Sequence, residues 1–186
     1  MTRKSTIKQI TITALFTAVI FVATSFIKFP IALGYIHLGD VFIMLASFML
    51  PPFFAVISAV VGSVLADLLA GFAIYMPITF LAKGLMALIA SLFFYKKTTL
   101  LKYILGSVLS SIAMVVCYFI FEGFVYGWAP AVANLPMQFV QPAVAILVGG
   151  AMIFSFKKIP FIMRLKDDIS PIRPKRVPKD DKTGDK

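Results

Sequence analysis

The sequence has 186 residues, of which 60% are hydrophobic and only 14% are charged, whereas roughly 25% of the residues in a soluble domain are charged. This composition excludes an ordinary water-soluble protein. Lys and Arg number 18 against 8 for Asp and Glu, and most of the basic residues lie near the two ends of the chain. Because this placement is typical of charge at a membrane surface, we expect a lipid bilayer and no nucleic acid as a partner.

A bilayer core of about 30 Å takes about 20 apolar residues of helix to cross. The sequence predicts helices at residues 7–27, 40–50, 53–70, 77–95, 101–124 and 134–156. The first apolar run is too long for the core of a signal peptide and has no small-residue cleavage site, so we expect it to be retained. The second is only about 16 Å long as a helix. Pro51 and Pro52 end it, because proline lacks an amide proton and disfavours helix at the preceding residue.

Basic residues set the predicted orientation. They precede the first helix, follow the sixth and occupy the connection between the fourth and fifth, at Lys96, Lys97 and Lys102. Such residues stay on the cytoplasmic side, and an even number of crossings brings all three segments there. We therefore predict an all-α integral membrane protein, a bundle of six transmembrane helices over residues 1–156 with both termini cytoplasmic. Residues 157–186 are predicted to be a basic, proline-containing cytoplasmic tail with little fixed structure.

Charged and amide side chains within the predicted helices fall in the outer half of the bilayer when depth is counted at about 1.5 Å per residue. This distribution predicts a pocket that is open to the outside and closed below, instead of a continuous pore. The candidate substrate-binding residues are His37, Asp40, Lys83, Glu122, Asn134, Gln138 and Gln141. The last three are spaced by four and three residues and so share one helix face. Aromatic residues at the same level either stack on a flat ligand or form an interfacial belt: Tyr75, Tyr118, Tyr126 and Trp128.

Some of these residues have simpler structural explanations. Asp67 and Lys83 lie on neighbouring predicted helices, so they either face the ligand or form an ion pair that locks those helices together. His37 and Asp40 have the spacing His-x-x-Asp, but one histidine and the single Cys117 predict no metal site, and Asp40 is better explained as the N-cap of the second helix. The lack of a convincing nucleophile with a base also argues against an enzyme.

Small residues form a second pattern. Ala14 and Ala18 lie one turn apart on the first predicted helix, and small residues recur every four positions along the third. Such faces let two helices approach closely. Because Ala14 and Ala18 lie below the level of the predicted pocket, a partner protein is expected to dock there.

Several motifs, in order along the chain, resemble those of one family. They are Gly34-Tyr-Ile-His-Leu-Gly-Asp40, the short helix that follows, Leu50-Pro-Pro-Phe53, the small-residue helix ending at Asp67, and Lys83-Gly84. Together they resemble the S component, the substrate-binding subunit of an energy-coupling factor (ECF) vitamin transporter. The resemblance covers most of residues 5–156. It implies a multi-pass protein of a prokaryotic cytoplasmic membrane, with six helices and a vitamin site near the outer face.

The resemblance also implies partners. Ala14 and Ala18 would contact the transmembrane T component, and two cytoplasmic ATPase subunits would supply the energy. The sequence has no Gly-x-x-x-x-Gly-Lys-Ser/Thr motif, so ATP is expected to be used by the partners, with no cofactor in this chain.

The loop sequence is most similar to the riboflavin-like branch of the family, which is also associated with hydroxymethylpyrimidine and pyridoxine-type substrates. We rank hydroxymethylpyrimidine (a thiamine precursor) or a pyridoxine-like compound first and riboflavin second. Nickel or cobalt is disfavoured, because that branch resembles an N-terminal histidine metal site and this chain begins Met1-Thr2-Arg3-Lys4. The main alternative is a self-contained secondary transporter, which normally has paired repeats and polar groups at the membrane midplane. Neither feature is visible in the sequence.

Overall fold

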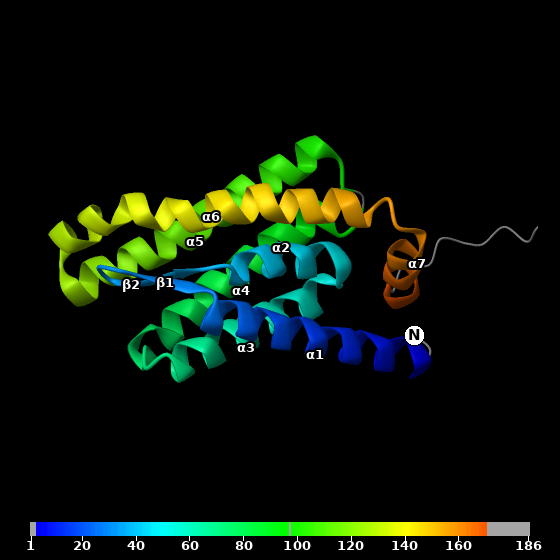
Figure 1. The fold of residues 1–186 in the computed structure, drawn as a ribbon, viewed down its shortest axis with the longest axis horizontal. Coiled ribbons are helices and arrows are strands. Elements are labelled where there is room, and N and C mark those ends of the chain that lie inside the picture. The colour runs from blue at the N-terminus through cyan, green and yellow to red at the C-terminus, as the bar shows by residue number, and fades with distance from the viewer. Residues whose placement is uncertain (1–2, 97, 171–186) are drawn as a thin grey trace, which may run out of the picture.

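The structure is a computed structural model that describes residues 3–96 and 98–170. Its elements are α1 (Arg3–Phe26), β1 (Lys28–Ile31), β2 (Gly34–His37), α2 (Gly39–Met49), α3 (Pro52–Leu69), the 3-10 helix η1 (Ala73–Tyr75), α4 (Met76–Phe94), α5 (Leu100–Tyr126), α6 (Trp128–Phe156) and α7 (Pro160–Ile169). The long helices run roughly along one axis, and α7 lies across one end of the bundle (Figure 1).

Five helical segments in the described part of the chain are long and apolar enough to cross a membrane. They are Thr6–Phe26, Pro52–Leu69, Ala73–Phe94, Leu100–Tyr126 and Trp128–Phe156. The helix α2 is also apolar but has only 11 residues. The predicted all-α membrane architecture is therefore confirmed, with one short β-hairpin added to it.

The short helix α2 lies at the centre of the bundle. Ten of its eleven residues are buried, and it packs against α1, α3, α4 and α6. Leu50 adopts an extended conformation before Pro51, and Pro52 begins α3, as the restrictions that proline places on itself and on the preceding residue require. The second helix therefore ends before the two prolines, as predicted.

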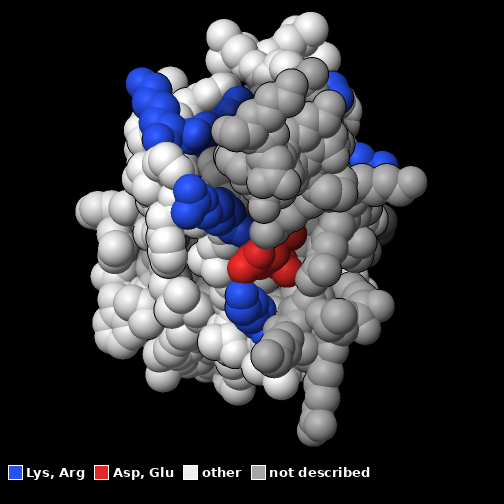
Figure 2. Space-filling view, turned by 90° about the vertical axis from the view of Figure 1, so that its right-hand side faces the viewer, with Lys and Arg blue, Asp and Glu red and all other residues white. Residues whose placement is uncertain are grey.

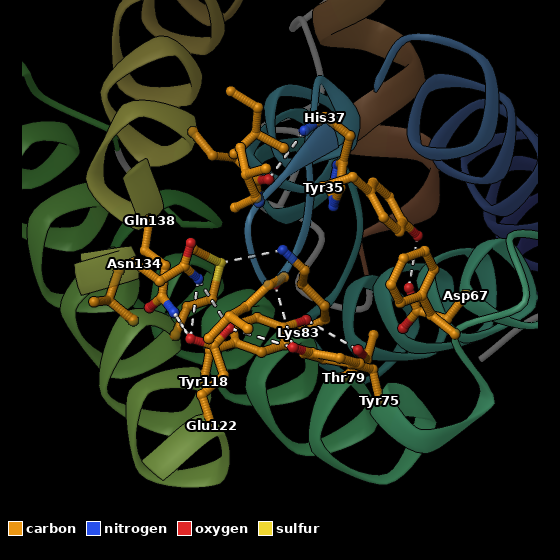
Figure 3. A pocket seen from close by; sticks show the side chains of 17 residues that line it. Tyr35, His37, Asp67, Tyr75, Thr79, Lys83, Tyr118, Glu122, Asn134 and Gln138 are labelled. Carbon is orange, nitrogen blue, oxygen red and sulfur yellow. Dashed lines mark hydrogen bonds between the residues drawn. The ribbon is translucent and has the colours of Figure 1, made fainter. Parts of the chain in front are cut away.

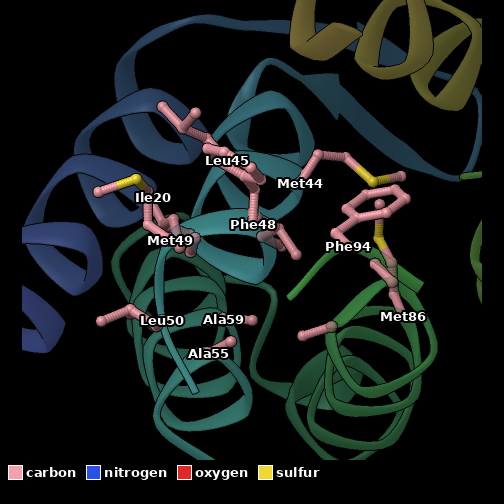
Figure 4. Packing of buried hydrophobic residues seen from close by; sticks show 14 of the residues in the cluster. Ile20, Met44, Leu45, Phe48, Met49, Leu50, Ala55, Ala59, Met86 and Phe94 are labelled. Atoms are coloured by element: carbon pink, nitrogen blue, oxygen red, sulfur yellow. The ribbon is translucent and has the colours of Figure 1, made fainter. Parts of the chain in front are cut away.

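The apolar core lies between α2 and the helices around it (Figure 4). Met44 and Phe48 from α2 and Phe94 from α4 are at most 1% exposed. Close approach of backbones also contributes: a Cβ atom built on Gly62 would lie 2.8 Å from the carbonyl oxygen of Thr17. Only glycine allows α3 to approach α1 this closely, so the position of α1 against the bundle depends on this residue type.

Residues 28–37 form a β-hairpin, which was not predicted. The strands β1 and β2 pair antiparallel, with Lys28 opposite His37 and Ile31 opposite Gly34. Each strand has only four residues, and Lys28 and Pro30 interrupt the apolar pattern of β1. A segment of this kind is typical of a polar break between helices, which is why the pairing is not evident from sequence.

The boundary between α5 and α6 also differs from the prediction. The helix α5 continues to Tyr126 and α6 begins at Trp128, six residues before the predicted start at residue 134. Gly127 forms the connection with a φ of +95°, a conformation that glycine adopts readily. The early start places the polar residues of α6 well inside the helix instead of at its beginning.

Helix α7 lies in the segment predicted to have little fixed structure, so that prediction is wrong for residues 160–169. Gln9 Nε2 donates a hydrogen bond to the carbonyl oxygen of Ile169 at 2.6 Å, and Lys8 Nζ lies 2.8 Å from Asp168 Oδ2. Ile169 is fully buried, and Ile162 and Met163 also pack against the core, so the apolar face of this amphipathic helix anchors it. Residues 171–186 of the predicted tail lie outside the described residues.

Basic side chains gather at the end of the molecule where α7 lies, around a small acidic patch (Figure 2). Lys157 Nζ donates to the carbonyl oxygen of Thr98 at 2.7 Å, which joins the end of α6 to the connection between α4 and α5. The start of α1, the α4–α5 connection and the end of α6 therefore meet at one end of the bundle, as the predicted order of crossings requires.

Candidate functional site

A cavity of about 70 Å³ lies between the β1–β2 hairpin and the facing parts of α3, η1, α4, α5 and α6 (Figure 3). Six of the seven candidate site residues line it: His37, Lys83, Glu122, Asn134, Gln138 and Gln141. The seventh, Asp40, does not line the cavity, but it accepts hydrogen bonds from two residues that do, Lys83 and Gln141. The structure therefore brings the predicted polar residues together around one cavity.

Glu122 on α5 accepts hydrogen bonds from two amides of α6 on one wall. Asn134 Nδ2 lies 3.2 and 3.0 Å from the two carboxyl oxygens, and Gln138 Nε2 lies 2.7 Å from one of them. The side chains of Glu122, Asn134 and Gln138 are 2%, 3% and 9% exposed. Burial of a carboxyl group is costly unless hydrogen bonds replace those it made to water. The hydrogen bonds from Asn134 and Gln138 therefore offset the cost of burying Glu122.

Lys83 on α4 pairs with Asp40 on α2, which corrects two predictions. Lys83 Nζ lies 2.6 Å from Asp40 Oδ1, and Gln141 Nε2 donates to Asp40 Oδ2 at 2.6 Å. The alternative in which Lys83 forms a structural ion pair with Asp67 is therefore wrong. A similar depth in the bundle does not fix how each helix is rotated about its own axis. Asp40 is not an N-cap: α2 begins at Gly39, and no side chain caps it.

The β1–β2 hairpin is tied to the rest of the cavity wall by three hydrogen bonds. They run from Tyr35 OH to Asp67 Oδ1 (2.7 Å), from the His37 backbone N–H to Gln141 Oε1 (3.1 Å) and from Tyr75 OH to the Leu33 carbonyl oxygen (3.2 Å). Each bond joins the hairpin to a different element, namely α3, α6 and η1. The hairpin is therefore held over the cavity by polar contacts with three separate elements.

His37 is held neutral at physiological pH. Its Nδ1 accepts a hydrogen bond from the Gly39 N–H at 3.0 Å, and burial together with the nearby charge of Lys83 lowers its pKa from 6.5 to about 3. Burial and the adjacent Asp67 raise the pKa of Tyr35, so its hydroxyl remains a donor. Among residues 3–96 and 98–170, no group of three or more His, Cys, Asp or Glu side chains is placed to hold a metal ion.

Aromatic residues that were not assigned to the site from the sequence also line the cavity. Tyr35 and Phe72 line the cavity with ring centroids 5.3 Å apart. Tyr75 and Tyr118, for which stacking on a ligand and an interfacial belt were both open, also line it. Alternate residues of a strand point to the same face, so recognition of the hairpin would have placed Tyr35 beside His37.

Ala14 and Ala18 line a separate apolar groove between α1 and α3. Both are exposed, and the opposite wall consists of Ile57, Val61 and Leu65. This groove shares no residue with the polar cavity. A partner that fills it would contact α1 and α3 without entering the cavity.

The long apolar helices and the enclosed polar cavity define an integral membrane protein with a cavity of the kind that binds small molecules. Residues 4–158 match the family model described as ECF-type riboflavin transporter, S component. The chain therefore belongs to the S-component family of ECF transporters, which is a family of transport subunits and not of enzymes.

Individual relatives agree with this membership. An uncharacterized protein of Pyrococcus woesei is 32% identical over 139 residues, which cover 74% of this chain and 93% of that protein. The thiamine precursor transporter HmpT of Lactococcus lactis subsp. cremoris (strain MG1363) is 35% identical over 145 residues, covering 76% and 83% of the two chains. A crystal structure of FolT bound with folic acid has a TM-score of 0.63 at 24% identity and covers 83% of this chain and 94% of its own, which shows a shared fold.

Proposed function

We propose that this chain is the substrate-binding subunit of an ECF-type importer and captures a small heteroaromatic vitamin or vitamin precursor beneath the β1–β2 hairpin. The observation that carries the proposal is the composition of the cavity wall. A carboxyl group from α5, amides from α6, a lysine from α4 and several tyrosine rings all line the cavity. Such a wall suits a flat ring with polar substituents, because the rings cover its faces and the polar groups bind its edges.

The first choice of substrate is hydroxymethylpyrimidine or a pyridoxine-like compound. The Lactococcus relative is a thiamine precursor transporter, and hydroxymethylpyrimidine is such a precursor. Size supports the choice: benzene binds in an engineered cavity of about 150 Å³, whereas this cavity measures about 70 Å³. Even one ring requires some movement of side chains, and the three-ring isoalloxazine of riboflavin requires much more. Riboflavin stays the second choice, supported by the description of the family.

The proposed topology has six crossings, with α2 as the short one and both termini in the cytoplasm. Exposed basic side chains at the α7 end of the bundle support this orientation (Figure 2), because such residues stay on the cytoplasmic side. The cavity and its hairpin then lie toward the outer face of a prokaryotic cytoplasmic membrane. A site at that level takes its ligand from outside the cell.

The proposed partners are a T component and two ATPases. The apolar groove with Ala14 and Ala18 is the proposed contact for the T component, because small residues let another helix approach closely. The sequence has no P-loop motif, so the partner ATPases would hydrolyse the ATP.

The binding step can be tested with the purified chain. Native mass spectrometry after extraction from cells should detect a retained small molecule, and calorimetric titration should give one site for hydroxymethylpyrimidine or pyridoxine. Gln138→Ala should weaken that binding about 5- to 150-fold, because it leaves a bonded partner unsatisfied. Leu147→Ala is the matched control on α6, since Leu147 is 74% exposed.

The outcomes separate the alternatives. Binding of riboflavin alone would replace the first choice of substrate with the second. Absence of binding of all three compounds to folded protein would contradict the proposal. Equal affinity in wild type and Gln138→Ala would move the site away from α6.

A further inference from the structure

Two buried amide oxygens in the cavity wall have no hydrogen-bond donor among the described residues. They are Asn134 Oδ1 and Gln138 Oε1, and their side chains are 3% and 9% exposed. Figure 3 shows both side chains beside Glu122 on the same side of the cavity. Buried polar atoms in folded proteins nearly always have a partner. Because Asn134 and Gln138 also line the cavity, a ligand bound there is in a position to supply the missing donors.

Glu122 fixes the orientation of both amides. The side-chain nitrogens of Asn134 and Gln138 donate to its carboxyl oxygens at 2.7 to 3.2 Å. Reversal of either amide would place an oxygen against the carboxyl group and lose that bond. The amide oxygens are thus directed away from Glu122, and both residues line the cavity.

The α4 side of the cavity presents a donor. Lys83 Nζ has three N–H bonds, and two of its acceptors in the structure are Asp40 Oδ1 at 2.6 Å and Met114 Sδ at 3.1 Å. The same nitrogen lies 5.6 Å from the centroid of the Tyr118 ring. The remaining N–H is available to a ligand acceptor held against that ring. The cavity thus suits a flat ligand with N–H donors at one edge and an acceptor at another.

We propose that Asn134 and Gln138 select a heteroaromatic ring that carries an exocyclic amine. This inference rests on the proposed function and narrows its substrate class. An amine offers two N–H donors to two oxygen acceptors, whereas a ring carbonyl at the same place would bring a third oxygen against them, which disfavours that ligand. A ring nitrogen or hydroxyl oxygen of the ligand accepts from Lys83. Hydroxymethylpyrimidine carries such an amine and pyridoxine carries only hydroxyl groups, so the former is the better match.

A pair of ligands that differ only in the amine tests the inference. The compounds are 4-amino-5-hydroxymethyl-2-methylpyrimidine and its analogue with hydrogen in place of the amine, titrated calorimetrically into the purified full chain. Without the amine the two buried acceptors stay unpaired, so we expect the wild type to bind the analogue at least about 10-fold more weakly. Asn134→Leu and Gln138→Leu each remove one acceptor and should reduce this ratio, mainly through weaker binding of the amino compound. Leu147→Ala should keep the ratio of the wild type.

The wild-type ratio is decisive even if a variant fails to fold. Affinities for the two compounds within about threefold of each other would overturn the inference and leave the proposed function standing, since a small pyrimidine would still bind. Binding of neither compound would overturn both. A ratio of the predicted size that persists unchanged in both folded leucine variants would assign the selection to other residues and overturn the roles of Asn134 and Gln138.

Discussion

Lys83 and Asp40 form a salt bridge inside the bundle, with 2.6 Å between Nζ and Oδ1 and with each side chain 1% exposed. The pair joins α4 to α2. Gln141 extends it, because its Nε2 donates to the other oxygen of Asp40 while its Oε1 accepts from the backbone N–H of His37. A buried ion pair is thus connected, through one amide, to the hairpin that covers the cavity.

Removal of one partner from this pair should lower the free energy of unfolding by about 3–5 kcal/mol, because the other charge stays buried without compensation. Lys83→Met and Asp40→Asn test this by thermal unfolding in detergent. The double variant buries neither charge, so it should lose less stability than the sum of the two single losses. Strictly additive losses would show that the two side chains do not stabilise each other.

Acidification should destabilise the hairpin through His37. Its pKa is about 3 in the folded protein and about 6.5 in an unfolded chain, so the unfolded state binds the proton more readily. Stability is therefore complete above about pH 6.5 and falls as the pH drops from 6.5 toward 3, by up to about 1.4 kcal/mol per pH unit. His37→Gln has no titrating group and should show a smaller slope in unfolding experiments between pH 6.5 and 5. The same slope in wild type and variant would refute this role of His37.

Large side chains introduced into the groove between α1 and α3 should block uptake without affecting ligand binding. Ala14→Trp and Ala18→Trp should abolish association with the T component and uptake, because close helix contact needs small side chains, and they should leave ligand binding by the isolated chain nearly unchanged. Leu15→Trp is a matched control, since Leu15 is 62% exposed and does not line the groove. Pull-down and uptake assays measure both effects. Normal uptake by both alanine variants would exclude the groove as the contact.

The proposed topology of six crossings places Lys96 and Ala129 on opposite sides of the membrane. Both residues are exposed, and a Cys117→Ala background removes the single native thiol. A membrane-impermeant maleimide should label the Ala129→Cys variant in intact cells and the Lys96→Cys variant only after permeabilisation. The reverse pattern would invert the topology, and labelling of both from outside would rule out six crossings.

The polar wall contributed by α6 could be predicted from spacing alone. Asn134, Gln138 and Gln141 share a face on any helix, whatever its surroundings. The partner of Lys83 could not be predicted in the same way. Rise per residue gives the depth of a side chain, but the choice between Asp40 and Asp67 depends on the rotation of each helix about its axis, which packing decides.

The hairpin and α7 were missed for a related reason. The hairpin strands have four residues each, too few for alternation to stand out, and Pro30 interrupts one of them. The fixed position of α7 depends on Ile169, whose carbonyl oxygen bonds to Gln9, a residue 160 positions away. Such long-range contacts leave no local pattern in the sequence.

Uptake by proteoliposomes distinguishes a subunit of an ATP-driven importer from a self-contained transporter most directly. Radiolabelled hydroxymethylpyrimidine would be offered to vesicles that contain this chain alone or this chain with a T component and two ATPases, with ATP supplied on the ATPase side. We predict accumulation only with the complete set and ATP, while the chain alone binds the compound without accumulating it. Accumulation by the chain alone, without ATP and driven by an ion gradient, would contradict its assignment as the substrate-binding subunit of an ECF importer.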